Sequence, residues 1–452
     1  MSATKLFGTD GIRGVAGEGW LAPDSASAVG LAAGRVLARS AGRTSGLRAV
    51  LGHDGRQSGP GLEQGLARGL RAAGYEVRSA GLITTPGLAT VARLFEEDLA
   101  IMVSASHNPA ADNGIKIFGP RGEKLSDELE AEIERALAKD ASPAPEGAAP
   151  EIDDVLDKSY IEALVASIEG LDLTGLKLVI DCANGAGSQI APIVFEQLGA
   201  EVVAIGSSPN GENINAGFGA THPEALTRAV TEHTAQLGIA LDGDGDRCIL
   251  VDETGSIVYG DAILMICGSD LAQRGRLAKK QIVATVMSNR GLHKALRDHG
   301  VGVTTVGVGD RQVVECLRKE RIELGGEQSG HIVFGEDFHF IGDGTYTALR
   351  VLDAMRRSSL TLSALAAPFK AFPQVLINRV VDKKPPLEEL PEVQAAVRAI
   401  EAELGEDGRV LLRYSGTESL ARVMVEGPDE AWIQTKADEL ANLVVAAIGS
   451  TP

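Results

Sequence analysis

Short apolar runs alternate with longer amphipathic stretches along most of the chain. Residues 47–51, 176–180 and 281–286 have the length and the Val/Ile/Leu content of buried strands. After each run come a loop, a helical pattern and a second apolar run. Strands that alternate with helices predict α/β layers in which the helices cover the sheet.

The same order of elements occurs three times. Each helical pattern ends at a glycine, the residue favoured just beyond a helix C-terminus: Gly74, Gly199 and Gly300. A second strand follows each glycine, over residues 75–77, 201–205 and 301–306. The repetition predicts three structurally similar α/β domains.

Each repeat also contains a polar loop. The strands 99–103 and 237–241 run into the loops Ser104–Pro109 and Asp242–Arg247, and the third repeat carries Gly325–His331. In open α/β sheets, ligands bind at the carboxyl ends of the strands. One such loop would be an ordinary turn, but three at equivalent places favour a functional site.

Two proline-rich segments divide the chain further. The segment 140–150 (DASPAPEGAAP) is typical of an exposed connector, and 382–391 precedes a last segment with a different pattern. That segment has a helical stretch at 393–404, a strand pair at 408–412 and 421–425, and a final helix from about Asp429. We therefore predict α/β domains over 1–150, 151–253 and 254–372, with mixed sheets sandwiched by helices, and a smaller α+β domain over 373–452.

Composition narrows the possible partners. The 452 residues include 43 Lys+Arg and 62 Asp+Glu, a net charge of −19, and 44% are hydrophobic. This is a globular composition, and its acidity argues against a nucleic-acid partner. No apolar run is long enough for a membrane span, and the N-terminus lacks an apolar export signal. We expect a cytoplasmic protein, in which four dispersed cysteines (Cys182, Cys248, Cys267 and Cys316) are free thiols.

The first polar loop reads Ser-Ala-Ser-His-Asn-Pro over 104–109. Its Ser-His pair could suggest nucleophilic catalysis, but neighbouring side chains in an extended loop usually diverge. No GxSxG elbow is present. Taken alone, the loop is a turn, because Asn-Pro is a turn signal.

The second loop places Asp242, Asp244 and Asp246 at alternating positions with glycines between them. A curved backbone can aim all three carboxylates inward, and oxygen ligands favour Mg²⁺ or Ca²⁺. An EF-hand is the alternative, since Glu253 stands at the twelfth position. However, Arg247 occupies the sixth position, where an EF-hand needs glycine, and a strand pattern follows. We therefore favour a catalytic divalent-metal site.

The remaining polar segments are weaker signals. The third loop, GGEQSGH, offers groups that suit sugar hydroxyls, although a plain polar turn is nearly as good an interpretation. The segment 413–418 (RYSGTE) could form an amide nest for a phosphate or be a surface turn. The N-terminal stretch 7–14 (FGTDGIRG) looks too glycine-rich for a regular strand, and Arg13 in it would be a second anion contact. The chain contains no P-loop, no GxGxxG after a strand and no HExxH.

Together, in this order and spacing, these motifs resemble the α-D-phosphohexomutase family. The resemblance extends from Phe7 to about Glu426. FGTDGIRG and GEQSGH, with residues 286–289 (VMSN) and 308–311 (VGDR), resemble the bacterial phosphoglucosamine mutase subgroup.

The resemblance implies four domains around a central cleft, with one loop from each. Ser106 matches the serine that carries the phosphoryl group, and the implied ligands of one Mg²⁺ per subunit are Ser106, Asp242, Asp244 and Asp246. The further catalytic positions it implies are Arg13, His107, Lys116, Arg247 and His331. The implied substrate contacts are Glu327 and Ser329 for sugar hydroxyls, and Arg413, Ser415, Gly416 and Thr417 for a distal phosphate.

The activity implied is interconversion of glucosamine 6-phosphate and glucosamine 1-phosphate through a bisphosphorylated sugar, which would also serve as activator. This reaction feeds UDP-N-acetylglucosamine and cell-wall synthesis. Alternatives are a mutase for glucose or mannose phosphates and a noncatalytic binding protein, although a binder needs no nucleophile. The expected state is a monomer or homodimer. Two positions depart from the family pattern: Ser419 stands where proline is usual, and Gly55 precedes Arg56 where threonine is usual.

Overall fold

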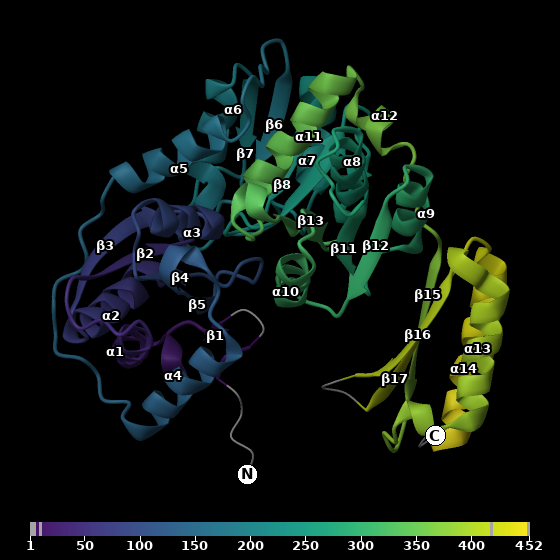
Figure 1. Cartoon of the computed structure of the whole chain (residues 1–452), viewed down its shortest axis with the longest axis horizontal. Coiled ribbons are helices and arrows are strands. Elements are labelled where there is room, and N and C mark those ends of the chain that lie inside the picture. Colours follow the sequence, from purple (N-terminus) through teal and green to yellow (C-terminus); the bar gives the residue numbers. More distant parts are fainter. Residues whose placement is uncertain (1–5, 9–10, 416–418, 450–452) are drawn as a thin grey trace. The chain divides into compact units, whose positions relative to one another are not determined.

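The computed structural model describes residues 6–8, 11–415 and 419–449. The chain forms two compact units, one of residues 1–287 with 304–366 and one of residues 288–303 with 367–452 (Figure 1). The first unit contains the three polar loops named above.

The first sheet belongs to the first unit and has five strands. Their order across the sheet is β1 (Ile12–Val15), β5 (Asp112–Phe118), β4 (Leu99–Val103), β2 (Leu47–His53) and β3 (Tyr75–Leu82). The strands β3, β2 and β4 are parallel, whereas β5 and β1 run antiparallel to their neighbours. Parallel strands buried on both faces read as apolar runs, as the sequence pattern indicated.

Helices cover this sheet. Apolar side chains of α1 (Pro23–Ser40), α2 (Gly59–Ala72) and α4 (Asp127–Lys139) form a common core with one face of the sheet, and α3 (Thr85–Leu94) lies against β2 and β4. The helices α1 and α2 approach each other closely: a Cβ added at Gly69 would lie only 2.0 Å from the Ser27 carbonyl oxygen. Part of the high glycine content therefore serves close helix packing.

The second and third sheets repeat this plan. The second has the order β10 (Ile257–Val258), β9 (Cys248–Asp252), β8 (Leu237–Leu241), β6 (Lys177–Asp181), β7 (Glu201–Ile205). The third has the order β12 (Gly302–Val306), β11 (Gln281–Thr285), β13 (Leu324–Gly326), β14 (Ile332–Phe334). Their helices in the first unit are α5 (Val155–Ala166), α6 (Ala191–Gln197), α7 (Glu224–His233), α8 (Gly260–Gln273), α10 (Asp310–Glu320), α11 (Gly344–Ser358) and α12 (Leu362–Ala366).

The three sheets share one topology. In each, a parallel strand is followed by an antiparallel one, and a polar loop joins the two: β4 to β5, β8 to β9, and β13 to β14. The predicted threefold repeat of mixed sheets with helices is therefore confirmed. The strand β9 begins directly after the Asp242–Arg247 loop, where an EF-hand would need a helix.

The N-terminal segment differs from its prediction. Residues 12–15, which looked too glycine-rich for a regular strand, form the edge strand β1. An edge strand needs only one neighbour, and the small residues permit its close approach to β5. A Cβ at Gly114, for example, would lie 2.8 Å from the Ile12 carbonyl oxygen.

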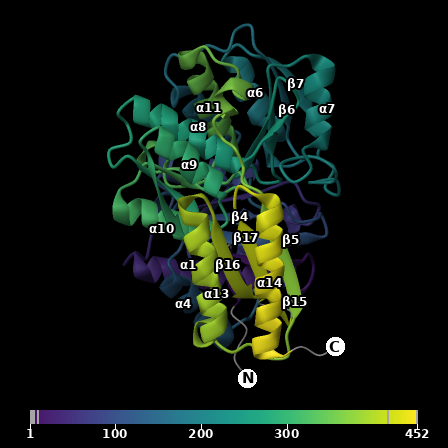
Figure 2. The same ribbon diagram turned by 90° about the vertical axis from the view of Figure 1, so that its right-hand side faces the viewer.

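The second unit is an antiparallel sheet covered by helices. Its strands are β15 (Gln374–Val380), β17 (Leu420–Glu426) and β16 (Arg409–Tyr414), in that order, so it has one strand more than the predicted pair. Figure 2 shows α13 (Pro391–Leu404) and α14 (Glu430–Ile448) side by side over one face. This is the predicted smaller α+β domain, and α9 (Arg290–Asp298) belongs to the same unit.

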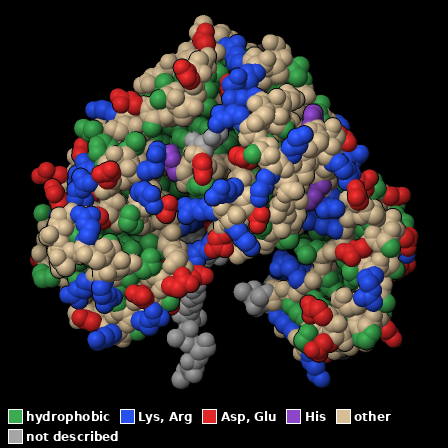
Figure 3. Space-filling model, viewed as in Figure 1, with side chains coloured by type: hydrophobic (Ala, Val, Ile, Leu, Met, Phe, Trp, Pro, Cys, Tyr) green, Lys and Arg blue, Asp and Glu red, His purple; other side chains and the backbone are tan. Residues whose placement is uncertain are grey.

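The composition made predictions about the charged surface residues, the cysteines and the helices. Acidic and basic side chains are interspersed over the visible face (Figure 3). Cys182, Cys248 and Cys267 are buried free thiols, and Cys316 is a partly buried one. Among the described residues, no helix is both long and apolar enough to cross a bilayer.

One buried carboxyl group in the first domain predicts a pH-dependent stability. Burial raises the pKa of Glu63 from 4.5 to about 7, and a Ser79 hydrogen bond offsets this only in part. His53 Nε2 lies 3.9 Å from Glu63 Oε2, but burial lowers the pKa of His53 to about 4, so the imidazole is neutral near pH 7. Glu63 therefore has no ion-pair partner in His53 at that pH.

Because the folded-state pKa of Glu63 lies above its unfolded value, its favourable contribution is complete below about pH 4.5 and is lost as the pH rises through about 7. Glu63→Gln should remove this loss, which amounts to about 3 kcal/mol. The variant should thus gain stability over the wild type between pH 5 and pH 8 in thermal unfolding. Glu76→Gln, at an exposed position of β3, is the control, and an equal gain there would contradict the assignment.

Candidate active site

The loop after β4 holds Ser106 in an unusual backbone conformation. Ser106 has φ 52°, in the left-handed region, and its side chain is buried. A non-glycine residue in this region costs about 1–3 kcal/mol, so surrounding contacts must hold it there. The Ser106 amide donates to Ser104 Oγ at 2.8 Å, and the Ser104 hydroxyl donates to Asp54 Oδ2 at 2.7 Å.

Arg56 is the main support of this loop. Its fully buried guanidinium pairs with Asp54 at 2.9 Å. The remaining donors reach the loop carbonyls of Ser106 at 2.9 Å, Asn108 at 2.8 Å, Asp112 at 3.0 Å and also Pro109. Five donors in a rigid fork can satisfy several carbonyls at once, which lysine could not do. Arg56 therefore holds the Ser106 loop in its conformation.

Asn215 supports the same loop from the second domain. Its amide nitrogen donates to the Ser106 carbonyl at 2.9 Å and to the Asn108 carbonyl at 3.1 Å. Asn215 is buried and has φ 60°. The sequence did not reveal this residue, because an asparagine beside Ala-Gly indicates only a turn. Asn215 and Ser106 are also 109 residues apart in sequence, so their contact cannot be inferred from a local motif.

The loop after β8 brings three carboxylates together. Asp242, Asp244 and Asp246 are buried, and one oxygen of each lies within 4.8 Å of the others. The intervening glycines are required here. Gly245 has φ 73°, and a Cβ at Gly243 would lie 2.6 Å from the Ser106 carbonyl oxygen. Glycine thus lets the acidic loop pack directly on the serine loop.

The two loops are joined by direct bonds from the first domain. The Ser106 hydroxyl donates to Asp242 Oδ2 at 2.6 Å. Asp244 Oδ2 accepts from Lys116 Nζ at 2.7 Å and from the Thr85 hydroxyl at 2.5 Å. The predicted serine, lysine and aspartates therefore lie in one cluster, and Thr85 is a contact that the sequence did not reveal.

Burial and neighbouring charges shift the pKa values of Asp242 and Asp246 in opposite directions. Burial, together with the charges of Asp246 and Asp244, raises the pKa of Asp242 far above its usual value. Burial also opposes ionisation of Asp246, but Lys116, His331 and Arg247 hold the pKa of Asp246 well below its usual range. Three carboxylates this close are costly without a compensating cation.

The aspartates fit a hard metal ion. Asp244 Oδ1 and Asp246 Oδ1 are buried and have no hydrogen-bond partner within the described parts of the chain. Buried acceptors without partners are uncommon and need an explanation. An oxygen-only set, with Ser106 adjacent, matches the preference of Mg²⁺. The acidic triad can therefore hold a metal ion.

A cavity of about 480 Å³ opens in front of the cluster. Of the predicted catalytic and substrate residues, it is lined by Arg13, Ser106, Asp246, Arg247, Glu327 and His331. Arg247 Nε is buried without a hydrogen-bond partner among the described residues. Positively charged groups beside a serine and an acidic metal cluster suit a phosphate group.

Two histidines near Ser106 and the triad have pKa values shifted in opposite directions. His107 Nδ1 lies 3.4 Å from Ser106 Oγ, and burial with nearby Arg247 and Arg13 lowers the pKa of His107. Burial also opposes protonation of His331, but the carboxylates of Asp246 and Asp310 overcome it and raise the pKa of His331 to about 9. His331 is therefore the cationic histidine of the site.

The other predicted residues are placed as follows. Ser329 is partly buried in the Glu327–His331 loop but is not among the residues that line the cavity. Arg413 and Ser415 belong to the second unit, where Arg413 is exposed and the Ser415 carbonyl accepts from Lys384 Nζ at 2.7 Å. Gly416 and Thr417 lie outside the described residues.

Models of a known protein family match most of the chain. Models of the phosphoglucomutase/phosphomannomutase family match residues 4–144 (alpha/beta/alpha domain I), 158–255 (alpha/beta/alpha domain II), 259–372 (alpha/beta/alpha domain III) and 376–443 (C-terminal domain). The chain belongs to this family.

Individual family members are similar over their full length. Phosphoglucosamine mutases from Ligilactobacillus salivarius and Geobacter metallireducens are 46% and 47% identical over 451 residues, which cover 98% of this chain and 99% of each relative. A solved structure of a phosphoglucomutase/phosphomannomutase family protein from Burkholderia thailandensis has a TM-score of 0.79 at 28% identity and covers 100% of this chain and 99% of its own. This mutase therefore has the whole family architecture.

The Asn215 contacts of this mutase predict a catalytic defect without unfolding. Asn215→Ala removes both bonds to the Ser106 loop, so the serine should lose its alignment with the acidic triad. A misplacement of about 1 Å can cost about 100-fold in rate. We expect kcat for sugar-phosphate isomerisation to fall roughly 10- to 100-fold with a smaller change in KM.

The matched control is Asn213→Ala. The Asn213 amide donates to the Ser208 carbonyl at 3.0 Å within its own loop and does not reach Ser106. Its kcat should stay within about twofold of the wild type, and both variants should unfold within a few degrees of it. Equal activity in the two variants would contradict a positioning role for Asn215.

Proposed function

We propose that this protein is a phosphoglucosamine mutase that interconverts glucosamine 6-phosphate and glucosamine 1-phosphate. The observation that carries the proposal is the 2.6 Å hydrogen bond from the Ser106 hydroxyl to Asp242, next to a cavity that Ser106, Arg13 and Arg247 line. Full-length similarity to proteins named phosphoglucosamine mutase supports the amino-sugar substrate. A phosphoglucomutase or phosphomannomutase is the alternative within the family.

In this proposal, Ser106 carries a phosphoryl group between turnovers. A hydroxyl oxygen of the sugar phosphate attacks the phosphorus, and the bond to Ser106 Oγ breaks as the new P–O bond forms. The product is a sugar bisphosphate, which then reorients within the site. Its other phosphate then passes to Ser106, so the serine ends as it began. Lys116, His331 and His107 are the candidates to accept or supply the hydroxyl proton.

Charge neutralisation is the main demand of phosphoryl transfer. Asp242, Asp244 and Asp246, with a phosphoserine oxygen, would hold Mg²⁺. Bound there, the ion would withdraw charge from the phosphoryl group. Arg13 and Arg247 line the cavity and would bind the equatorial phosphoryl oxygens, while Glu327 and Ser329 would bind sugar hydroxyls.

The bisphosphate must bind in two orientations, so the phosphate remote from Ser106 needs its own contacts. We assign these to Arg413, Ser415, Gly416 and Thr417, the motif in the second unit. We further propose one Mg²⁺ per subunit and a sugar 1,6-bisphosphate as activator. A cytoplasmic location, a role in supplying peptidoglycan precursors, and a monomeric or homodimeric state also belong to this proposal.

The nucleophile is tested with Ser106→Ala. Without an acceptor oxygen, the variant should lose at least about 1,000-fold in mutase activity. Intact-mass measurement after incubation with glucosamine 1,6-bisphosphate should show one added phosphoryl group in the wild type and none in the variant. A fully active variant, or a wild type that is never phosphorylated, would refute the mechanism.

The same assay separates the substrate alternatives. Turnover is compared on glucosamine, glucose and mannose 6-phosphates at equal concentrations, and kcat/KM should be highest for the amino sugar. A higher value for glucose or mannose phosphate would keep the phosphoserine mechanism and replace the proposed substrate.

The metal site predicts a stability response to Mg²⁺. A ligand that binds only the folded state raises its stability with concentration, so Mg²⁺ should raise the unfolding temperature of the wild type. Asp242→Asn should abolish most of this rise. In metal-free buffer the variant should be no less stable than the wild type, because it replaces a buried carboxyl group whose ionisation is disfavoured with a neutral amide of the same shape.

The control for this experiment is Glu253→Gln, at the position that an EF-hand would use. Glu253 accepts a hydrogen bond from the Ser363 hydroxyl and lies outside the triad. The Glu253→Gln variant should therefore keep the full rise in unfolding temperature with Mg²⁺. Loss of the response in Glu253→Gln, or its retention in Asp242→Asn, would contradict the proposed metal site.

A further inference from the structure

His331 is held by groups on three sides. Its Nδ1 lies 3.6 Å from Asp246 Oδ1, and its Nε2 lies 3.8 Å from Asp310 Oδ2. Gly342 lies against the ring, because a Cβ there would be 2.4 Å from His331 Nε2. One carboxylate belongs to the acidic triad, and the other is at the first residue of α10.

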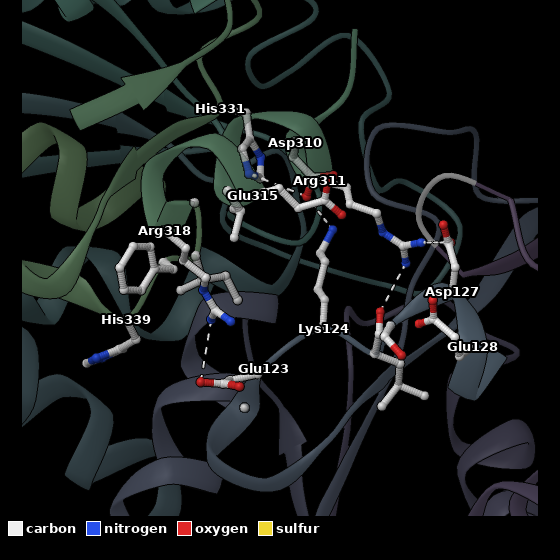
Figure 4. A pocket seen from close by; sticks show the side chains of 17 residues that line it. Glu123, Lys124, Asp127, Glu128, Asp310, Arg311, Glu315, Arg318, His331 and His339 are labelled. Atoms are coloured by element: carbon white, nitrogen blue, oxygen red, sulfur yellow. Dashed lines mark hydrogen bonds and ion pairs between the residues drawn. The ribbon is translucent and has the colours of Figure 1, made fainter. Parts of the chain in front are cut away.

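Asp310 is in turn held from the first domain. Lys124, which lies between the first sheet and α4, forms an ion pair with Asp310 Oδ2 (Figure 4). In that view, the Lys124 side chain extends toward Asp310, with His331 beyond it. Lys124, Asp310, His331 and Asp246 thus form a row of alternating charge that ends at the triad.

Two cavities adjoin the ring. His331 and Asp310 line the cavity that contains Ser106, and both also line a second cavity of about 270 Å³. The lining of this second cavity includes the apolar residues Val314, Phe340 and Ile341. A side chain that lines cavities has fewer close-packed neighbours than a core residue, so polar contacts matter more to its orientation. The carboxylates of Asp246 and Asp310, at 3.6 and 3.8 Å, are beyond hydrogen-bond length but attract the ring electrostatically at its two opposite nitrogens.

We propose that Asp310 is a positioning residue that, held by Lys124, fixes the His331 ring toward Asp246 and the phosphoryl group on Ser106. Contact with Asp246 alone would fix one ring nitrogen and leave the ring free to rotate away. The second carboxylate at Nε2 removes that freedom. This inference deepens the proposed function and rests on it, because it assigns His331 a part in the same reaction.

A double-mutant cycle tests the inference. Asp310→Asn keeps the shape of the side chain and removes its charge. We expect kcat to fall about 10- to 100-fold with KM within about threefold, as for a misplaced catalytic group. In a His331→Gln background the same change should alter kcat less than about twofold, because groups that act as a unit are non-additive.

Lys124 gives a graded second test. Lys124→Gln should lower kcat in the same direction and by less than Asp310→Asn, and Lys124→Arg should restore most of the activity. The matched control is Arg318→Gln, which breaks another ion pair between the same two domains, Arg318 to Glu123 at 3.5 Å. That pair does not involve Asp310, so kcat should stay within about twofold of the wild type.

A readout independent of activity uses the ring itself. In protein labelled on histidine, the His331 ring signal is identified by its loss in His331→Gln. Asp310→Asn should shift or broaden this signal, and Arg318→Gln should leave it unchanged. This measurement decides the inference even if His331→Gln is too slow to assay.

The outcomes separate the two levels of the proposal. An inactive wild type would overturn the proposed function. An active wild type in which Asp310→Asn has an equal effect with and without His331 would overturn only this inference, since Asp310 would then act directly on the substrate. An unchanged His331 signal in Asp310→Asn would overturn it as well.

Discussion

The approach of three buried carboxylates to within 4.8 Å of one another is the constraint on which the site depends. Each carboxylate loses hydration on burial, and each repels the other two. The surrounding structure offsets this cost with Lys116 on Asp244, the Ser106 hydroxyl on Asp242, and His331 near Asp246. Two oxygens, on Asp244 and Asp246, remain without a hydrogen bond within the described residues. The triad can therefore hold a metal ion, and a bound cation would complete its electrostatic balance.

No single domain could build this balance. The first domain supplies the serine and the lysine, the second supplies the acids, and the third supplies the histidine. The repeated topology makes this possible, because each sheet presents its polar loop at the same place, after the last parallel strand. Bonds between loops then set the register: Asn215 to the Ser106 carbonyl and Thr85 to Asp244. Catalytic precision in such a fold rests on residues that never touch substrate.

The sequence predicted the elements better than the contacts between them. Residues 99–103 and 237–241 are strands with the predicted bounds, because their apolar runs end sharply at polar loops. The strand β1 was missed, since edge pairing, not local propensity, determines it. The triad could be found because its three acids are close in sequence. Asn215, Thr85 and Asp310 could not, because each gains its role from a neighbour more than twenty residues away in sequence.

A net charge of −19 would by itself repel an anionic substrate. Charges farther away than a Debye length, about 8 Å at physiological salt, are largely screened. The charges on the cavity wall therefore determine the electrostatic potential that a bound substrate experiences. That wall carries Arg13, Arg247 and a His331 whose pKa is raised to about 9. The same acids that make the chain negative raise that pKa and so keep the histidine cationic. The wall also carries Asp246, Asp310 and Glu327, and two of these acids, Asp246 and Asp310, keep His331 cationic. Positive charge for a phosphate is thus held in place by neighbouring acids.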